Sequence, residues 1–120
     1  MHAHFLVLAS AFEELNLGSY RSRLDIIADI LHVVSQSAKK TQIMYQANLS
    51  YKVLTRYLRE VSEASLVDFE CGRQCYVLTT KGRAFLEAYR EYSKGSRHLE
   101  KRLNEINSKR KLLEALSSSR

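Results

Sequence analysis

The chain has 120 residues, which suits one small domain with an appendage rather than two independent cores. Its 19 Lys and Arg against 13 Asp and Glu give a formal net charge of +6. This balance favours a polyanionic partner without distinguishing DNA from RNA or an acidic membrane. The absence of Pro argues against a flexible linker, and no apolar run is long enough to span a membrane.

Residues 1–20 form an N-terminal extension in which we expect a short helix over 5–17. Four apolar residues recur there at helical spacing: Phe5, Leu8, Phe12 and Leu15. A secretory signal is the alternative, because Ala9-Ser10-Ala11 resembles a cleavage site. The start lacks the Lys or Arg that such signals carry, so we expect a cytoplasmic protein.

A nearly all-apolar helix is predicted after Ser22, with Ser22 as its N-cap and Asp25 in its first turn. Its apolar residues form two stripes: Leu24, Ile27, Ala28, Leu31 and Val34 on one, and Ile26, Ile30 and Val33 on the other. A helix that is apolar over so much of its circumference is buried on more than one side. We therefore expect it to be the central helix of the core.

Two helices joined by a tight turn follow. The first is predicted over 42–47 with Thr41 as its N-cap, and the second over 51–64 with Ser50 as its N-cap. Inward positions of the second helix are expected at Leu54, Leu58 and Val61. We interpret Tyr45, Tyr57 and Tyr76 as residues of the core or its edge.

Two strands are predicted next, over 66–71 and 75–79, with Gly72-Arg73-Gln74 as the loop between them. Together these elements predict a mainly α fold with a small β-hairpin (α+β), a winged helix-turn-helix domain over 21–82. Such a domain places one helix in the DNA major groove. Cys71 and Cys75 flank the loop and could face each other across the hairpin. They could form a disulfide, or they could remain two reduced thiols, which is the default in cytosol.

A long helix capped by Thr79 or Thr80 is predicted to run to about Leu116. We expect residues 83–120 to form a dimerisation helix of the coiled-coil type. An apolar seam begins at Phe85 and continues through the residues expected to dimerise: Tyr89, Tyr92, Leu99, Leu103, Ile106 and Leu113. A small domain cannot cover a seam of this length, so we expect a homodimer. Gly95 is the point at which the helix is most prone to kink or break.

The residues expected to contact DNA lie mainly on the helix over 51–64. Lys52, Arg56 and Arg59 fall opposite Leu54, with Thr55 beside them. Ser50 and Tyr51 at the helix start, and Lys39, Lys40 and Gln42 before it, are candidates for phosphate contacts. Arg73 at the loop could reach a minor groove or a phosphate.

No catalytic motif is present, and the Cys-x-x-x-Cys spacing stands without a second ligand pair. We therefore expect no enzyme activity, no cofactor and no metal.

From about Arg21 to Leu116 the chain resembles the archaeal winged-helix family typified by the small Sso-ten-a chromatin-type DNA-binding proteins. The resemblance is carried by Arg23-Leu24-Asp25-Ile26-Ile27, Ile43-Met44-Tyr45, Asn48-Leu49-Ser50-Tyr51, Tyr57-Leu58 and Tyr76-Val77-Leu78-Thr79-Thr80-Lys81-Gly82. It implies an antiparallel coiled-coil dimer that binds duplex DNA. Carried onto this chain, it places recognition at Ser50, Tyr51, Lys52, Thr55 and Arg56, and the wing at Arg73.

The function expected from the sequence is double-stranded DNA binding by a homodimer, as a transcriptional regulator or a nucleoid-associated protein. Two alternatives stay open. One is a protein-protein interaction module that uses the winged helix and the C-terminal helix for assembly. The other is an RNA-binding regulator.

Overall fold

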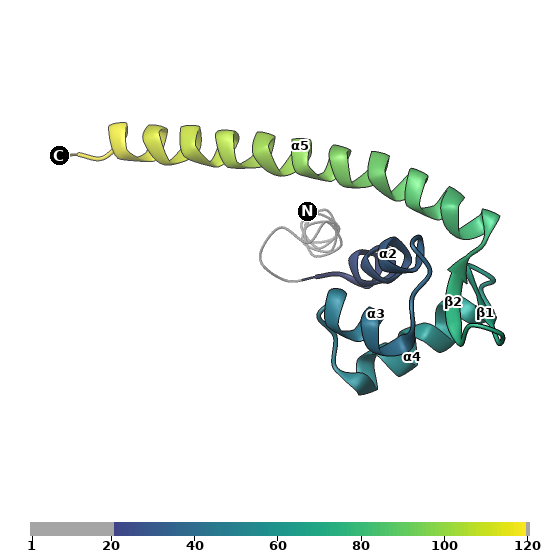
Figure 1. The fold of residues 1–120 in the computed structure, drawn as a ribbon. Helices are drawn as coiled ribbons and strands as arrows, with labels where there is room; N and C mark the ends of the chain where they lie inside the picture. Colours follow the sequence, from purple (N-terminus) through teal and green to yellow (C-terminus); the bar gives the residue numbers. More distant parts are fainter. Residues whose placement is uncertain (1–20, 120) are drawn as a thin grey trace. The chain divides into compact units, whose positions relative to one another are not determined.

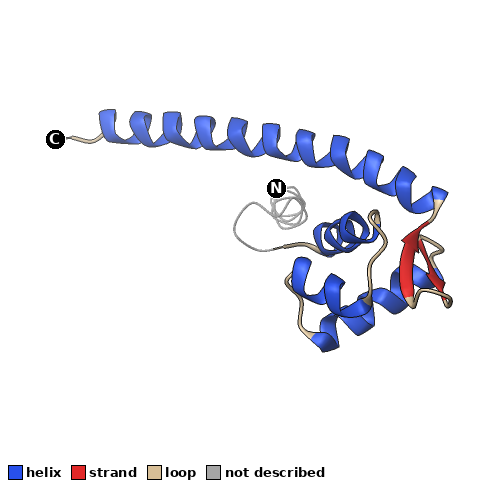
Figure 2. Ribbon diagram, in the orientation of Figure 1, coloured by secondary structure: helices blue, strands red, loops and turns tan. Residues whose placement is uncertain are grey.

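The computed structural model describes residues 21–119, so the helix expected over 5–17 lies outside the described residues. The elements run in the order α2 (Arg23–Val34), α3 (Lys40–Gln46), α4 (Tyr51–Glu63), β1 (Val67–Glu70), β2 (Cys75–Leu78) and α5 (Thr80–Leu116) (Figures 1 and 2). This order of helices, hairpin and long helix confirms the expected fold class. The contacts divide the chain into a first unit that ends at Arg90 and a second unit that begins at Glu91.

The helix α2 is the centre of the first unit. Ser22 is its N-cap, as expected: the Ser22 Oγ accepts a hydrogen bond from the Asp25 N–H, and the Asp25 carboxylate accepts one from the Ser22 N–H at 2.9 Å. Ile30, Leu31 and Val34 are completely buried. Burial on both stripes makes α2 the element against which α3 and β2 pack.

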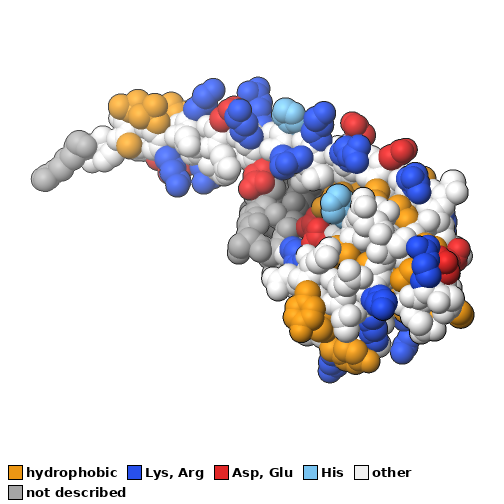
Figure 3. Space-filling model, in the orientation of Figure 1, with side chains coloured by type: hydrophobic (Ala, Val, Ile, Leu, Met, Phe, Trp, Pro, Cys, Tyr) orange, Lys and Arg blue, Asp and Glu red, His pale blue; other side chains and the backbone are white. Residues whose placement is uncertain are grey.

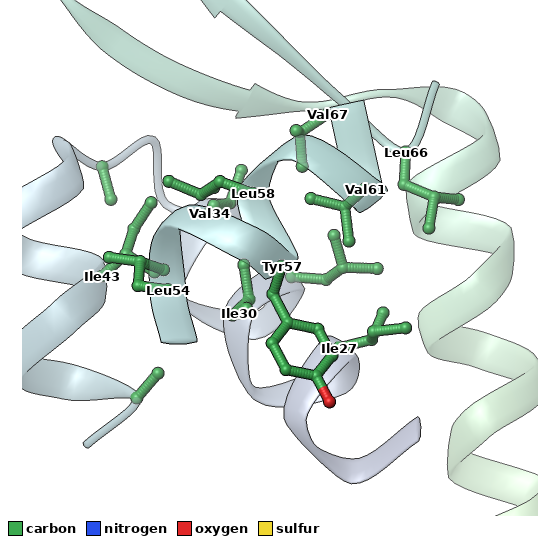
Figure 4. Close-up of a cluster of buried hydrophobic side chains, with 13 residues drawn as sticks. Ile27, Ile30, Val34, Ile43, Leu54, Tyr57, Leu58, Val61, Leu66 and Val67 are labelled. Carbon is green, nitrogen blue, oxygen red and sulfur yellow. The ribbon is translucent and has the colours of Figure 1, made fainter. Parts of the chain in front are cut away.

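The core is completed mainly by α4 and the start of the hairpin (Figure 4). Leu54, Leu58 and Val61 point inward, as predicted, and Tyr57 is buried beside them. Leu66 and Val67 close the cluster next to α4. Each large aliphatic side chain buried in this way contributes roughly 1.5–3 kcal/mol, so the hydrophobic cluster fixes how α4 is presented.

The hairpin is antiparallel and pairs Val67 with Leu78 and Glu70 with Cys75. Both strands are shorter than predicted: β1 ends at Glu70 because the chain turns at Cys71, and β2 ends at Leu78 because Thr79 caps α5. Glu70, and not Cys71, is the partner of Cys75 across the hairpin, so the two cysteines do not face each other. Both cysteines are free thiols, one exposed and the other buried.

A third segment pairs with β2 on its other side. Ala38 donates its N–H to the Tyr76 carbonyl at 3.1 Å and accepts from the Tyr76 N–H at 2.8 Å. This bridge lies between α2 and α3, and a single paired residue leaves no alternating pattern in the sequence. It ties the hairpin to the helical core.

The junction between β2 and α5 is closely packed. Thr79 is the residue that caps α5, since its Oγ1 accepts from the Gly82 N–H at 2.9 Å. A Cβ on Gly82 would lie 2.2 Å from the Leu66 carbonyl oxygen and 2.6 Å from the Leu78 Cδ1. Only glycine fits there. Phe85 and Leu86 then pack against the core of the first unit.

The second unit consists of the remainder of α5, which continues through Gly95 without the break that the sequence suggested. Large apolar side chains of the predicted seam are exposed on it: Tyr92, Leu99, Ile106 and Leu113. Tyr89 lies in the first unit instead, where its hydroxyl donates a hydrogen bond to the Asp25 carboxylate. None of the described helices is apolar over a length that could cross a membrane.

Candidate nucleic-acid interface

The turn between α3 and α4 is built by backbone hydrogen bonds. Asn48 adopts a left-handed conformation with φ of 53°, which Asn tolerates better than most residues. The Leu49 N–H donates to the Met44 carbonyl at 3.0 Å and so ends α3. Ser50 then caps α4, as predicted, with its Oγ accepting from the Val53 N–H at 3.2 Å. This turn sets the direction in which α4 leaves α3.

Arg21 holds this turn from outside the two helices. Its guanidinium donates to the Ala47 carbonyl at 2.7 Å and to the Asn48 carbonyl at 2.9 Å, and it pairs with Asp29 at 3.0 Å. Three bonds from one planar group fix the turn against α2. No local pattern in the sequence indicates this role of Arg21, because its partners lie up to 27 residues away.

The outward face of α4 carries three cations. Lys52, Arg56 and Arg59 are all exposed, on the face opposite the buried Leu54 and Leu58. Among the residues that the structure describes, none of the three forms an ion pair with a carboxylate. The Arg56 guanidinium lies 5.1 Å from the centre of the Tyr57 ring, a cation–π contact that leaves its charge available to a ligand.

Thr55, expected beside these cations, donates its hydroxyl to the Tyr51 carbonyl at 2.8 Å. That bond uses the hydroxyl proton within α4, so the side chain retains only its acceptor lone pairs for a ligand. The opposite end of α4 is acidic: Glu63 is exposed, and Glu60 pairs with Arg23 of α2. Positive charge on the outer face is therefore concentrated toward the N-terminal part of α4.

The start of α3 differs from the prediction. Lys39, not Thr41, is the N-cap, because the Gln42 Oε1 accepts a hydrogen bond from the Lys39 N–H at 3.0 Å. Because the Gln42 side-chain oxygen is hydrogen-bonded at the helix end, only the N–H groups of its amide remain for a phosphate. The Lys40 ammonium lies 4.3 Å from the centre of the Tyr51 ring, which places it at the start of α4. Lys39 is exposed.

Arg73 at the hairpin tip is engaged by its own strand. Its Nε donates to one Glu70 oxygen at 3.0 Å and its Nη2 to the other at 2.8 Å. These hydrogen bonds hold the pKa of the Glu70 carboxyl below its ordinary value of 4.5. A lowered carboxyl pKa means that the pair persists at neutral pH and is lost only as the pH falls through that lowered value. At the wing, the positive charge of Arg73 is therefore balanced by the negative charge of Glu70.

The tyrosines are distributed differently from the expectation. Tyr57 is buried and Tyr76 is half-buried against the Phe69 ring, with centroids 5.0 Å apart. Tyr45 is 78% exposed, so its assignment to the core or its edge is wrong. At 100° per residue, Tyr45 falls on the side of α3 opposite the buried Ile43 and Ala47. Tyr51 is also 65% exposed. Apolar and basic side chains adjoin one another over this part of the surface (Figure 3).

Lys81 has a structural role that its position in the sequence does not indicate. Its ammonium donates to the Ala64 carbonyl at 2.7 Å and so satisfies the C-terminal end of α4. Among the described residues, no group of His, Cys, Asp or Glu is placed to hold a metal ion.

Comparison with known proteins identifies the class. Residues 20–97 match the family model described as winged helix-turn-helix. Because this match covers more than half of the chain, the protein belongs to the winged helix-turn-helix family. No curated protein sequence matches it.

Two solved structures share the fold. One is Sso10a-2, described as a DNA-binding protein from Sulfolobus solfataricus, with 23% identity and a TM-score of 0.59 over 82% of this chain and 100% of that one. The other is the Mycobacterium tuberculosis MarR family protein Rv2887 in complex with DNA, with 17% identity and a TM-score of 0.58 over 91% of this chain and 84% of that one.

Proposed function

We propose that the protein binds double-stranded DNA as a homodimer, with α4 in the major groove and the wing at 72–74 beside it. Its role is that of a transcriptional regulator or a nucleoid-associated protein. One observation carries the proposal: Lys52, Arg56 and Arg59 share the exposed face of α4 and have no carboxylate partner among the described residues. The DNA-binding descriptions of both similar structures support the same ligand.

The chemistry of this face fits a duplex. Arg56 and Arg59 can each donate two parallel hydrogen bonds to guanine, whereas Lys52 suits a phosphate as a mobile point charge. The N-terminal end of α4 adds the partial positive charge of the helix dipole. Lys40, held over Tyr51, extends the basic surface to the start of α3.

The exposed seam of the second unit supports the homodimer. Leu99, Ile106 and Leu113 recur at heptad-like spacing and are between 44% and 66% exposed. A row of large apolar side chains in water favours association with a matching row, as in a coiled coil. A second copy of the chain supplies such a row.

Fluorescence anisotropy with a labelled mixed-sequence duplex tests the ligand. We expect binding at about 50 mM salt that weakens steeply by about 200 mM, because each phosphate contact releases condensed counterions. A folded sample that binds no duplex at the lower salt would contradict the proposal and favour the interaction module. If duplex RNA competes for the protein more strongly than duplex DNA does, the RNA-binding alternative is favoured.

The Arg56→Ala variant tests the assignment of α4. We expect a loss of duplex affinity of about fivefold to 100-fold, which corresponds to roughly 1–3 kcal/mol for one well-placed arginine. Lys109→Ala is the matched control, since it removes one exposed cation from the second unit. Equal affinity of the two variants would show that α4 does not carry the binding.

A further inference from the structure

A second basic surface lies on α5, within the second unit. Lys94, Arg97, His98 and Lys101 are all exposed and together line one shallow hollow. Their spacing of three, four and seven residues places them on a single face of the helix. We call this face the basic stripe. Lys and Arg side chains gather with a histidine along α5 in Figure 3.

The basic stripe differs from the other cations of the second unit. Arg102 pairs with Glu105 at 3.6 Å and Arg110 with Glu114 at 3.9 Å. Within residues 91–119, no carboxylate forms an ion pair with the stripe, and Glu100 and Glu105 line the adjoining hollow beside Arg97 and Lys101 without pairing with them. Like charges three and four residues apart repel one another and destabilise a helix. A bound polyanion would relieve that repulsion.

The stripe also stays accessible when the seam is covered. At about 3.6 residues per turn, Lys94, Arg97 and Lys101 fall on the side of α5 opposite Leu99. A partner helix against Leu99 therefore leaves the stripe in solvent. The two faces of α5 can be used at the same time.

The charge density matches a nucleic-acid backbone. Lys94 to Lys101 spans about 10 Å of helix at 1.5 Å per residue. One DNA strand carries a phosphate about every 3.4 Å of its axis, or about three over that length. The number of permanent cations in the stripe, three, therefore matches the number of phosphates of one strand that they would face.

We propose that the basic stripe is a second DNA-binding surface, which contacts the phosphate backbone of a duplex without reading its sequence. The proposal takes its ligand from the proposed function but does not depend on α4. Lys and Arg on one face of a helix supply charge along the backbone, whereas base readout needs a helix seated in a groove. The stripe therefore adds affinity and salt dependence to DNA binding, not specificity.

The decisive experiment removes α4 binding first. In a Lys52→Ala/Arg56→Ala/Arg59→Ala background, we expect residual, salt-sensitive binding of a mixed-sequence duplex at about 50 mM salt. Adding Lys94→Ala, Arg97→Ala and Lys101→Ala should weaken this residual binding at least tenfold. The control adds Arg102→Ala, Lys109→Ala and Lys111→Ala, which removes the same formal charge from positions of α5 that lie outside both the stripe and the seam. We expect the control to change affinity less than twofold.

A second readout locates the contact. Acetylation of lysines followed by mass spectrometry should show that the duplex protects Lys94 and Lys101 in the α4-substituted background, while Lys109 and Lys111 react as in the unbound protein. Protection by vesicles that contain phosphatidylserine, but not by duplex, would overturn the proposal in favour of a membrane surface.

The outcomes separate the two proposals. If the α4 substitutions abolish all duplex binding, the proposed function stands and the stripe proposal fails. If the stripe and control triple variants bind equally, the stripe proposal also fails. If the α4 substitutions leave duplex affinity at the unsubstituted value, the assignment of α4 fails, and the stripe variants alone then report where DNA binds.

Discussion

At the scale of single residues, the basic side chains of the first unit fall into two groups. Arg21, Arg23 and Lys81 have partners in other elements of the fold and hold those elements together. Lys52 and Arg59 have no such partner among the described residues and remain available to a ligand. Net charge alone does not separate these groups, because the distinction depends on which carbonyls and carboxylates come within reach.

Arg73 differs from both groups, because it is exposed but paired with Glu70 of its own hairpin. This pairing leads to a prediction for the wing. Glu70→Gln removes the carboxylate that holds Arg73, so we expect duplex affinity to rise about threefold or more at low salt, where the released cation gains a phosphate contact. Asp68→Asn is the control, because it removes an equal charge from an exposed position of the same strand. Duplex titrations of both variants give the comparison. An equal gain in both would assign the effect to net charge alone.

Replacing either of two glycines of α5 with Ala is expected to change the free energy of unfolding, in opposite directions. Gly82→Ala places a Cβ against the Leu66 carbonyl and should lower the free energy of unfolding by about 2 kcal/mol or more, since backbone cannot move aside. Gly95→Ala meets nothing within 4 Å and should raise it by up to about 1 kcal/mol through helix propensity. Denaturation at matched protein concentration measures both. A neutral Gly82→Ala would contradict the close junction.

At the scale of elements, helix ends position the candidate interface. The end of α3, the turn at Asn48 and the cap at Ser50 determine where α4 begins. Each depends on one or two hydrogen bonds to orphan backbone groups, which a helix terminus must satisfy. The orientation of α4 is then fixed by its buried face.

The cap of α4 gives the prediction at this scale. Ser50→Ala leaves the Val53 N–H without its side-chain acceptor and should lower the free energy of unfolding by about 1 kcal/mol. Ser62→Ala is the control, because Ser62 is exposed within the same helix and Ala favours helix there. Chemical denaturation followed by circular dichroism provides the measurement. If Ser50→Ala were as stable as Ser62→Ala, the cap would contribute nothing.

At the scale of the whole molecule, α5 is expected to join two copies of the chain. The seam of the second unit is apolar and exposed, and the first unit uses Phe85 and Leu86 within its own core. Tyr89 also serves the first unit through Asp25. The part of the seam proposed for dimerisation is therefore the part beyond Arg90.

Substitutions in this seam test the assembly. Leu103→Asp or Ile106→Asp should convert the dimer to a monomer, because a charge buried in a coiled-coil seam is left unpaired. Leu112→Asp is the matched control, since Leu112 is exposed but lies off the seam. Sedimentation analysis distinguishes the species. A monomeric unsubstituted protein, or equal disruption by Leu112→Asp, would refute the seam.

The sequence by itself determined the order of the elements, the central helix, the N-caps at Ser22 and Ser50 and the inward face of α4. These are local properties, since apolar periodicity and capping depend on residues within a turn or two of one another. Only the tertiary structure decided the bridge at Ala38 and the hydrogen bonds of Arg21 to the turn. The same holds for the register that sets Cys75 opposite Glu70 and for the exposure of Tyr45. Each of these depends on how elements pack or pair, a geometry that residue spacing along the chain does not encode.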